Sequence, residues 1–398
     1  MPGILPWTGL AVRAPAGSAA GMDDIAAEFL LDPGFNTVNH GSFGAAPRSV
    51  LAAQDAWRAR LEAQPSRFMV EVLTPALRAA AAGLAGFLGG DPEGLGFVDN
   101  TTAACNAVLR SLAFAPGEEI LLLGHAYGAV RKTAEHIAAG AGARVVEAPL
   151  PFPRPEPEAV VQALARAITP RTRLAVLDHI TSPSALVLPI EAMVAACRDR
   201  GVPVLVDGAH GPGQVPLALG ALGADWYAGN CHKWLMAPKG CAFLWTAPQR
   251  RAGTHAPILS HGLGEGYLAE FDWTGTRDPS AWLAVTEAIA FLERLGGAAL
   301  MDRNRALARE AGARLAARLG TEVGARPEMA GSMALVRLPL PGPADRAAAV
   351  ALRARLLAAG TDAPVTAIDG RFWLRLSAAA YNRPQDYDRL GDLLGAIL

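Results

Sequence analysis

The sequence predicts an α/β fold, in which a large domain holds a mostly parallel seven-stranded sheet and a smaller α/β domain follows at the C-terminus. Between residues 45 and 250, short apolar runs alternate with segments that carry apolar residues at three- and four-residue spacing. Strands that are apolar on both faces and joined by helices are typical of a parallel sheet covered on both sides. The 398 residues, of which 51% are hydrophobic and 18% charged, provide cores for two or three domains of roughly 100–200 residues each.

Seven apolar runs are the strand candidates of the large domain: Leu95–Val98, Glu119–Leu123, Arg144–Ala148, Leu174–Leu177, Val202–Val206, Asp225–Ala228 and Cys241–Trp245. The segments between most of them predict helices at Thr101–Leu112, Gly128–Ala139, Glu158–Ala167 and Ile190–Arg200. Only Lys233–Gly240 separates the last two strand candidates. This short connection leaves an antiparallel arrangement open for that pair.

The C-terminal third begins with an irregular segment. Residues 251–277 are rich in glycine, histidine and aromatic residues and have no clear periodicity, which predicts a long functional or mobile loop. The tail then alternates between predicted helices and strands: helix Ser280–Arg294, helix Asp302–Leu319, strand Met333–Leu338, helix Ala344–Ala359, strand Phe372–Leu376 and helix Gln385–Leu398. We therefore expect an N-terminal arm at residues 1–30, a large domain at 31–279 and a small C-terminal domain at 280–398.

The charge balance argues against two classes of partner. The formal net charge is −1, with 36 basic and 37 acidic residues, and no basic stripe or polybasic run supports binding to nucleic acid or to an anionic membrane surface. The sequence has no uninterrupted apolar stretch of about 18 residues, so no membrane span is expected. The first 22 residues lack the basic start and apolar core of a signal peptide. We expect a cytoplasmic protein.

The four cysteines (Cys105, Cys197, Cys231 and Cys241) form no Cys-x-x-Cys pair, and no histidines cluster around them. A disulfide framework and a zinc finger are therefore both unexpected. The sequence predicts no metal site.

Lysine is scarce in this chain, which narrows the search for a reactive amine. Only Lys132, Lys233 and Lys239 are lysines, and arginine does not readily lose its proton to act as a nucleophile. Lys233 follows a strand candidate and stands between His232 and Trp234. Aromatic and apolar neighbours lower the pKa of a lysine by desolvation, which an amine that forms a Schiff base requires. Lys132 on a helix and Lys239 in a Pro-Lys-Gly turn are typical of solvated charges.

An acid and a polar helix start complete the pattern. Asp207 ends an apolar strand, and ligands of open α/β sheets bind beyond the carboxyl ends of strands. A strand-end acid and a buried lysine suit pyridoxal phosphate, because the lysine binds its aldehyde and the acid keeps its ring nitrogen protonated. A helix that opens near Thr101 offers exposed N–H groups to the phosphate. The alternatives for these residues are a turn or capping aspartate and an ordinary helix N-cap.

Four segments carry a resemblance to a known family. The stretch DGAHGPGQVPLALGALGADWYAGNCHKWLMAPKG resembles the cofactor-binding core of fold type I, class V aminotransferase-like enzymes. The segments VNHGSFGAAPRSVLAAQ, DHITSPSALVLPI and GRFWLRLSAAAYNRPQDYDRL resemble, more narrowly, the isopenicillin N epimerase-like branch. The resemblance runs in order from about Val38 to Leu390. It implies the fold type I architecture of pyridoxal phosphate enzymes, with pyridoxal 5′-phosphate as the cofactor.

The resemblance assigns roles around this cofactor. It makes Lys233 the Schiff-base lysine, pairs Asp207 with the pyridine nitrogen and places His210 at the phenolic oxygen. Tyr127 would stack on the ring face, where any flat π surface is adequate. The remaining cofactor-binding residues that it implies are Thr101, Thr102 and His232 at the phosphate, and Ser182.

On the substrate side, the resemblance makes Arg375 the residue that grips the α-carboxylate, a contact that suits a planar guanidinium. Asn39 and His40, and again Ser182, would lie near the substrate, a small amino acid. Thr276 would reach the phosphate of a neighbouring subunit, which implies a homodimer with active sites at the interface.

The fold and the cofactor do not fix the reaction. Our leading hypothesis is an epimerase or racemase of the isopenicillin N epimerase type, in which Lys233 removes the Cα proton. A second acid would deliver a proton from the opposite face, and the candidates are Tyr127, His40 and His261. The alternatives are a C–S lyase of the hercynylcysteine sulfoxide lyase type and an aminotransferase. A protein that binds pyridoxal phosphate without turnover is less favoured.

Two further reactions are disfavoured. Cysteine desulfurases need a nucleophilic cysteine shortly before the carboxylate-binding arginine, and residues 320–398 contain no cysteine. A nicotinamide-dependent oxidoreductase would need Gly-x-Gly-x-x-Gly after its first strand, and the nearest glycine-rich stretch, residues 262–266, follows a loop.

Overall fold

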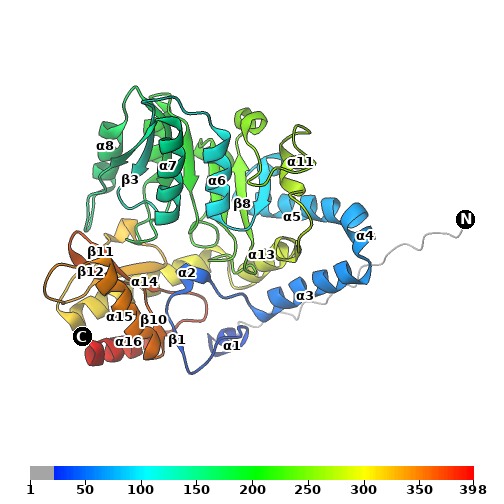
Figure 1. Cartoon of the computed structure of the whole chain (residues 1–398). Coiled ribbons are helices and arrows are strands. Elements are labelled where there is room, and N and C mark those ends of the chain that lie inside the picture. Colours follow the sequence, from blue (N-terminus) through cyan, green and yellow to red (C-terminus); the bar gives the residue numbers. More distant parts are fainter. Residues whose placement is uncertain (1–21) are drawn as a thin grey trace, which may run out of the picture.

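The computed structural model describes residues 22–398, so most of the predicted N-terminal arm lies outside the described residues. Its main feature is a seven-stranded sheet with the strand order β2-β8-β7-β6-β5-β3-β4 (Figure 1). The seven strands are β2 (Leu95–Val98), β3 (Glu119–Leu123), β4 (Arg144–Ala148), β5 (Thr172–Asp178), β6 (Val204–Asp207), β7 (Trp226–Asn230) and β8 (Ala242–Thr246). Only β8 runs antiparallel to its neighbours β7 and β2, so the predicted, mostly parallel sheet is confirmed.

Helices cover both faces of this sheet because its strands are apolar on both sides. Leu121 and Leu123 of β3 face one core with α5, α8 and α9, whereas Ile120 and Leu122 face a second core with α6, α7 and α11. The helices of this part are α5 (Leu73–Leu88), α6 (Thr101–Ser111), α7 (Gly128–Ala141), α8 (Pro157–Ala167), α9 (Ile190–Arg198), α10 (Leu219–Leu222) and α11 (Tyr267–Asp272), with short 3-10 turns η2 (Pro92–Gly94) and η3 (Pro248–Gly253).

A smaller three-stranded antiparallel sheet, β11-β12-β9, lies in the C-terminal part. The elements there are α14 (Ala298–Leu319), η4 (Pro327–Met329), β9 (Met333–Arg337), α15 (Arg346–Ala358), β10 (Thr361–Asp362), β11 (Val365–Ile368), β12 (Arg371–Ser377) and α16 (Pro384–Ile397). Helices α14, α15 and α16 and this sheet enclose a core of their own. The predicted smaller α/β unit is therefore present, although β10 and β11 were not expected.

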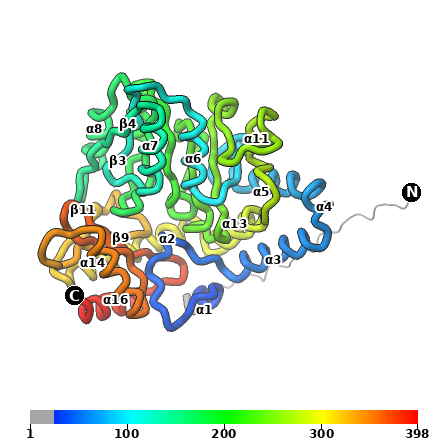
Figure 2. Tube along the Cα trace, viewed as in Figure 1, coloured from blue at the N-terminus to red at the C-terminus, as the bar shows by residue number. Residues whose placement is uncertain are grey.

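The N-terminal segment joins the two parts of the chain. Its elements are α1 (Met22–Ala27), β1 (Asn36–Thr37), α2 (His40–Phe43), α3 (Arg48–Ala63), α4 (Pro65–Arg67) and the π-helical turn η1 (Phe68–Val72). Strand β1 pairs in parallel with β10, so segments more than 300 residues apart lie side by side, as the trace in Figure 2 shows. This pairing brings α2 toward the end of β12.

The predicted loop at 251–277 contains a helix, α11, which corrects the sequence interpretation. Tyr267 and Phe271 are four residues apart, lie on the buried face of α11 and have ring centroids 4.5 Å apart. Phe271 packs so closely on β2 that a Cβ at Gly96 would be 2.4 Å from its ring. The predicted helix Ser280–Arg294 is also divided, into α12 (Ser280–Leu283) and α13 (Val285–Arg294). Both α12 and α13 pack against α3 and α5. The predicted domain boundary between residues 279 and 280 stays a prediction.

One continuous helical stretch, Pro65–Leu88, is long and apolar enough to cross a membrane by length and composition alone. It comprises α4, η1 and α5, and 39% of its most apolar window is buried inside the protein. Leu77, Leu84 and Leu88 of α5 belong to the core on one face of the large sheet. This stretch was not identified from the sequence, and the expected absence of a membrane span stays a prediction.

Candidate active site at the carboxyl ends of the parallel strands

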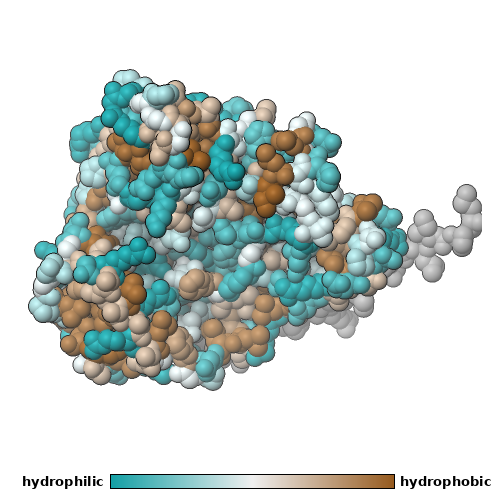
Figure 3. Space-filling model, in the orientation of Figure 1, coloured by the Kyte–Doolittle hydropathy of each residue, from teal (hydrophilic) through white to brown (hydrophobic). Residues whose placement is uncertain are grey.

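A cavity of about 400 Å³ lies at the carboxyl ends of β5, β6 and β7, next to the first turn of α6. It is the place where ligands bind in open α/β sheets. Eight of the predicted site residues line it: Thr101, Thr102, Tyr127, Ser182, Asp207, His210, His232 and Lys233. The other lining residues are Ser42, Phe43, Asn100, Asp178, Ile180, Ala209 and Asn230. Figure 3 shows hydrophilic residues across the middle of one face of the molecule, between the elements of the large sheet and the C-terminal elements.

Lys233 lies in the turn that follows β7, and its Nζ is 3.2 Å from Nε2 of His210. Burial, and then the charge of Arg375, lower the pKa of the Lys233 amine from 10.5 to about 8, while Asp207 acts in the opposite direction. An amine with this pKa is partly neutral near pH 7–8, which a nucleophile or a base requires. Lys239, in contrast, is exposed and donates to the main-chain oxygen of Gly44 (2.5 Å).

Two buried carboxyl groups stand side by side in this cavity. Asp207 ends β6, Asp178 ends β5, and the two residues are partners in the parallel register. Burial raises the pKa of Asp207, opposed by the Ala209 N–H that it accepts (3.1 Å) and by Lys233. Burial and Asp207 raise the pKa of Asp178 well above its usual range. Within residues 22–398 neither carboxyl group has a salt-bridge partner, so the pair suits a cationic ring nitrogen.

Asp178 was missed by sequence reasoning. The signal was present, because Asp178 ends an apolar strand in LDHITS just as Asp207 ends one in LVDGAH. The predicted strand stopped at Leu177, whereas β5 includes Asp178. The carboxylate also accepts the main-chain N–H of Tyr127, which lies at the start of α7.

Another part of the cavity wall is suited to an anion. The hydroxyl of Thr101 and Nδ1 of His232 are both buried and have no hydrogen-bond partner among residues 22–398. Thr101 is the first residue of α6, whose N-terminus carries a partial positive charge. Asn100 caps the helix by accepting the N–H of Ala103 (2.9 Å), and Asn230 accepts the N–H of Thr101 (2.9 Å). The unused polar atoms fit a phosphate group.

Arg375 lies behind the cavity wall on β12, almost fully buried. Its Nη1 donates to the main-chain oxygen of Ser182 (2.6 Å). Its Nη2 donates to the hydroxyl of Ser42 (2.8 Å) and to Oδ1 of Asn39 (3.2 Å). Nε has no partner in the described part of the chain. Burial, and then the charge of Arg353, lower the pKa of Arg375 to about 10, so the guanidinium is charged at neutral pH. Arg375 does not itself line the cavity, and its contact with a substrate carboxylate stays a prediction.

Asn39 and His40 do not line the cavity, and their predicted substrate contacts stay predictions. Asn39 donates Nδ2 to Asp362 (2.6 Å) and thereby presents its oxygen to Arg375. His40 has a pKa lowered by burial to about 4, donates Nε2 to the main-chain oxygen of Lys233 (3.0 Å) and accepts the Tyr381 hydroxyl at Nδ1 (3.0 Å). Both residues therefore hold other site residues in place.

The remaining candidates lie apart or at the rim. His261 lines a different hollow with Arg78 and Trp273, so the structure does not bring it to the cavity. Thr276 is exposed and does not line the cavity of its own chain; its predicted contact with a neighbouring subunit stays a prediction. Of the three candidates for the second acid, Tyr127 is the one at the cavity wall, with 45% of its surface exposed.

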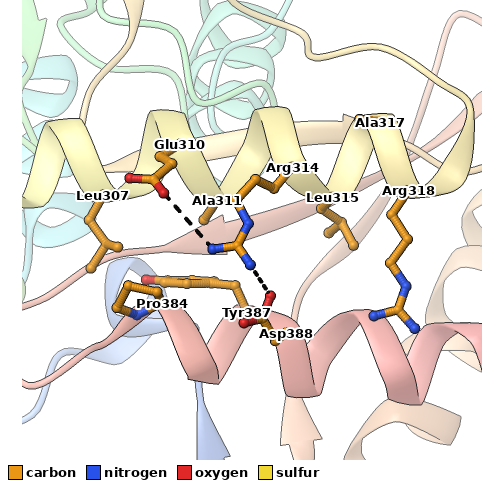
Figure 4. Close-up of a pocket in the computed structure, with 10 residues that line it drawn as sticks. All are labelled: Leu307, Glu310, Ala311, Arg314, Leu315, Ala317, Arg318, Pro384, Tyr387 and Asp388. Atoms are coloured by element: carbon orange, nitrogen blue, oxygen red, sulfur yellow. Dashed lines mark hydrogen bonds and ion pairs between the residues drawn. The ribbon is translucent and has the colours of Figure 1, made fainter.

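A separate hollow of about 320 Å³ lies between α14 and α16, far in the sequence from most predicted site residues. Figure 4 shows its apolar floor, which includes Leu307 and Leu315, and the guanidinium of Arg314 between Glu310 and Asp388. Its two arginines, Arg314 and Arg318, are already paired with Asp388 and Asp392, and none of the predicted site residues lines it. This hollow is therefore not the candidate active site.

Comparisons with known proteins show which family and which fold this chain shares. A family model of class V aminotransferases matches residues 44–390. The putative L-cysteine desulfhydrase 1 of Oryza sativa subsp. japonica is 40% identical over 77% of this chain and 68% of that protein. The isopenicillin N epimerase of Streptomyces clavuligerus is 34% identical over 96% of this chain and 99% of that protein. The fold matches a cystine C–S lyase, C-DES, solved with cysteine persulfide, with a TM-score of 0.77, 22% identity and coverage of 91% and 98% of the two chains.

Proposed function

The chain belongs to the class V aminotransferase family, whose members use pyridoxal phosphate, and on that premise we propose that it removes the Cα proton of an amino-acid substrate and epimerises it. One observation carries the proposal: an amine with a lowered pKa and two buried carboxyl groups line one cavity, and the guanidinium of Arg375 lies directly behind the wall residue Ser182. When bound, the cofactor accepts the substrate's amine and withdraws electrons from Cα.

The residues of this chain would hold the cofactor by its two ends. Asp207, beside Asp178, would pair with the ring nitrogen and keep it protonated, since a cation relieves the cost of a buried carboxylate. At the other end, the unpartnered hydroxyl of Thr101 and Nδ1 of His232 would face the phosphate. Tyr127 also lies at the cavity wall.

The substrate would be oriented by its carboxylate. Arg375 presents a charged, planar group from behind Ser42 and Ser182, and its Nε is unused within the described residues. Gripping the carboxylate there fixes the direction of the Cα–H bond relative to the Lys233 amine. Lys233 then takes the proton, as a base whose pKa lies near neutrality.

Epimerisation also needs a proton from the face opposite to Lys233. We assign this step to Tyr127, because His40 has both ring nitrogens engaged and His261 lies elsewhere. The likeness to the isopenicillin N epimerase of Streptomyces clavuligerus, which is matched over 99% of its length, supports epimerisation as the reaction.

A second candidate is cleavage of a C–S bond. The observation that favours it is the 40% identity to a putative L-cysteine desulfhydrase, a name that denotes release of sulfide from cysteine. Cα deprotonation is common to both reactions, but elimination needs a leaving group on Cβ and no acid on the far face of Cα. The outcome therefore depends on the substrate side chain and on Tyr127.

The experiment is incubation of the holoenzyme with single D- and L-amino acids in deuterated water. Cα deuterium incorporation with inversion supports the epimerase. Release of sulfide from cysteine, or of a thiol from an S-substituted cysteine, together with pyruvate and ammonia supports the lyase. Transfer of the amino group to an added keto acid would instead identify an aminotransferase. Tyr127→Phe should abolish inversion while leaving exchange with retention. Absence of Cα exchange with every amino acid would refute the proposal.

A further inference from the structure

Three side chains form a hydrogen-bonded row that ends at the Lys233 amine. The indole Nε1 of Trp234 donates to Nδ1 of His210 (3.2 Å), and Nε2 of His210 is 3.2 Å from Nζ of Lys233. Trp234 and His210 are 3% and 2% exposed. His210 comes from the loop after β6, and the other two residues come from the turn after β7. The row therefore links two neighbouring strand ends.

The donors and acceptors of this row determine where its hydrogen atoms lie. An indole N–H is a donor only, so Nδ1 of His210 must offer its lone pair to Trp234. A neutral imidazole carries one hydrogen, which is then on Nε2 and points at Lys233. An ammonium group has no lone pair to accept that N–H, whereas a neutral amine has one. The row is satisfied only when Lys233 is neutral.

We propose that Trp234 is a positioning residue that fixes the tautomer of His210 and thereby holds the Lys233 amine in its neutral, proton-accepting form. The inference rests on the proposed function, in which Lys233 is the base. When Nζ takes the Cα proton, its lone pair is consumed, and the hydrogen bond from His210 Nε2 breaks. Loss of this hydrogen bond disfavours the protonated form of Lys233. The ammonium group of Lys233 therefore gives up its proton readily.

Packing prevents the indole from leaving its partner. Trp234 belongs to an apolar cluster with Ile180, Val215 and Met333, and its ring centroid is 5.1 Å from that of His40. The backbone around it is equally tight, because a Cβ at Gly213 would be 2.5 Å from the main-chain oxygen of Trp234. The orientation of the His210 ring is therefore fixed by Trp234, which does not line the cavity.

Other charged groups also act on the Lys233 amine. The titratable groups that face it from the surrounding elements are Tyr127, Asp178, Asp207, His210, His232 and Arg375. Among them Arg375 favours the neutral amine and Asp207 favours the ammonium. Replacement of Trp234 leaves these groups in place, so the test isolates the tautomer.

The first test needs no substitution. The chain has eight histidines, and ¹⁵N labelling of histidine in the full chain, stripped of cofactor, reports the protonation of each ring nitrogen. We expect His210 to carry its hydrogen on Nε2 across the pH range in which the protein is folded. A hydrogen on Nδ1 would overturn the proposal.

The second test measures the amine. Acetylation of Lys233 as a function of pH is followed by peptide mass spectrometry, with the exposed Lys132 as internal reference. In Trp234→Phe, His210 can present a lone pair to an ammonium, so the midpoint of Lys233 acetylation should rise by about one pH unit. Trp226→Phe is the matched control, because it deletes another buried indole hydrogen bond, to Thr254 (2.8 Å), and should leave the midpoint unchanged.

An unchanged midpoint in Trp234→Phe would overturn the proposal, as would an equal rise in Trp226→Phe. Both measurements use the protein without cofactor, so they are independent of the reaction. Failure of the proposed function would appear as absent Cα exchange in the wild-type holoenzyme, whatever the tautomer of His210. The ¹⁵N measurement on the wild type decides the question if Trp234→Phe does not fold.

Discussion

Replacement of Arg375 by lysine tests recognition of the substrate carboxylate. The guanidinium already donates to Ser182, Ser42 and Asn39 through Nη1 and Nη2, while Nε is buried without a partner among residues 22–398. Lysine keeps the positive charge and can retain one of the internal acceptors. It cannot offer two parallel N–H groups to a carboxylate.

The expected loss follows from this geometry. Lysine forfeits one of two charge-assisted hydrogen bonds to the carboxylate, each worth about 1.5–3 kcal/mol. This loss corresponds to a decrease in kcat/KM of about 10- to 150-fold for amino acids. Most of it should appear in KM, because the carboxylate is bound in the ground state as well as in the transition state.

The assay is the rate of Cα deuterium incorporation for an amino acid and for the corresponding amine that lacks the carboxylate. Arg375→Lys should slow the amino acid and leave the amine, slow already, unchanged. Arg337→Lys on the neighbouring strand β9 is the matched control, since Arg337 pairs with Glu322 (3.2 Å) outside the cavity. An equal loss for both substrates, or no loss for the amino acid, would refute the assignment of Arg375.

Three further predictions concern the residues at the cofactor's phosphate, the carboxyl groups at its ring nitrogen, and the pH dependence of the free energy of unfolding. Thr101→Val removes a buried hydroxyl that has no hydrogen-bond partner among the described residues, so Tm should stay within a few degrees or rise. The Kd for pyridoxal phosphate, measured by absorbance titration, should increase about tenfold. An unchanged Kd would contradict a role for Thr101 at the phosphate. Asp207→Asn should reduce Cα exchange at least about 100-fold, because an amide does not keep a ring nitrogen protonated. Asp178→Asn should cost less than about tenfold, because burial and the neighbouring charge of Asp207 together favour the neutral form of the Asp178 carboxyl group. Equal losses in the two variants would contradict this division. Burial lowers the pKa values of His40 and His179 from 6.5 to about 4, so the unfolded chain binds more protons than the folded one between these values, and the free energy of unfolding should fall as the pH falls from 6.5 to 4. Denaturant titrations should show a shallower fall in His179→Gln, and the same slope as the wild type would contradict neutral burial of His179.

The sequence predicts those parts of the site that depend on one strand and the residue after it. Asp207 ends one strand and Lys233 comes three residues after the end of another, and the chemistry of both can be inferred from the local sequence. Asp178 is different, because its significance comes from the register that sets it beside Asp207 across two strands. A strand end that is predicted one residue too early, as at Leu177, hides the pairing of Asp178 with Asp207.

Contacts between distant segments are the part that the sequence does not reveal. Asn39 reaches Arg375 across 336 positions, and Asp362 reaches Asn39 across 323. These contacts depend on the pairing of the two-residue strands β1 and β10, which are too short to leave a periodic pattern. Helix α11 was missed for a related reason: only one face of its six residues is buried, and glycines flank it.

The contacts that run from Arg353 to Arg375 would couple the proposed binding of a substrate carboxylate to the pairing of β1 with β10. Arg353 of α15 holds Asp362 through two hydrogen bonds (2.8 and 2.9 Å), Asp362 accepts Nδ2 of Asn39, and Asn39 then presents its oxygen to Arg375. These contacts hold the Arg375 guanidinium in place for a bound carboxylate only while β1 stays paired with β10. By linkage, a ligand that binds the ordered arrangement better must also stabilise that pairing. Amino-acid binding should therefore slow amide hydrogen exchange at Asn36, whose N–H donates to Gly360, even though neither residue touches the cavity.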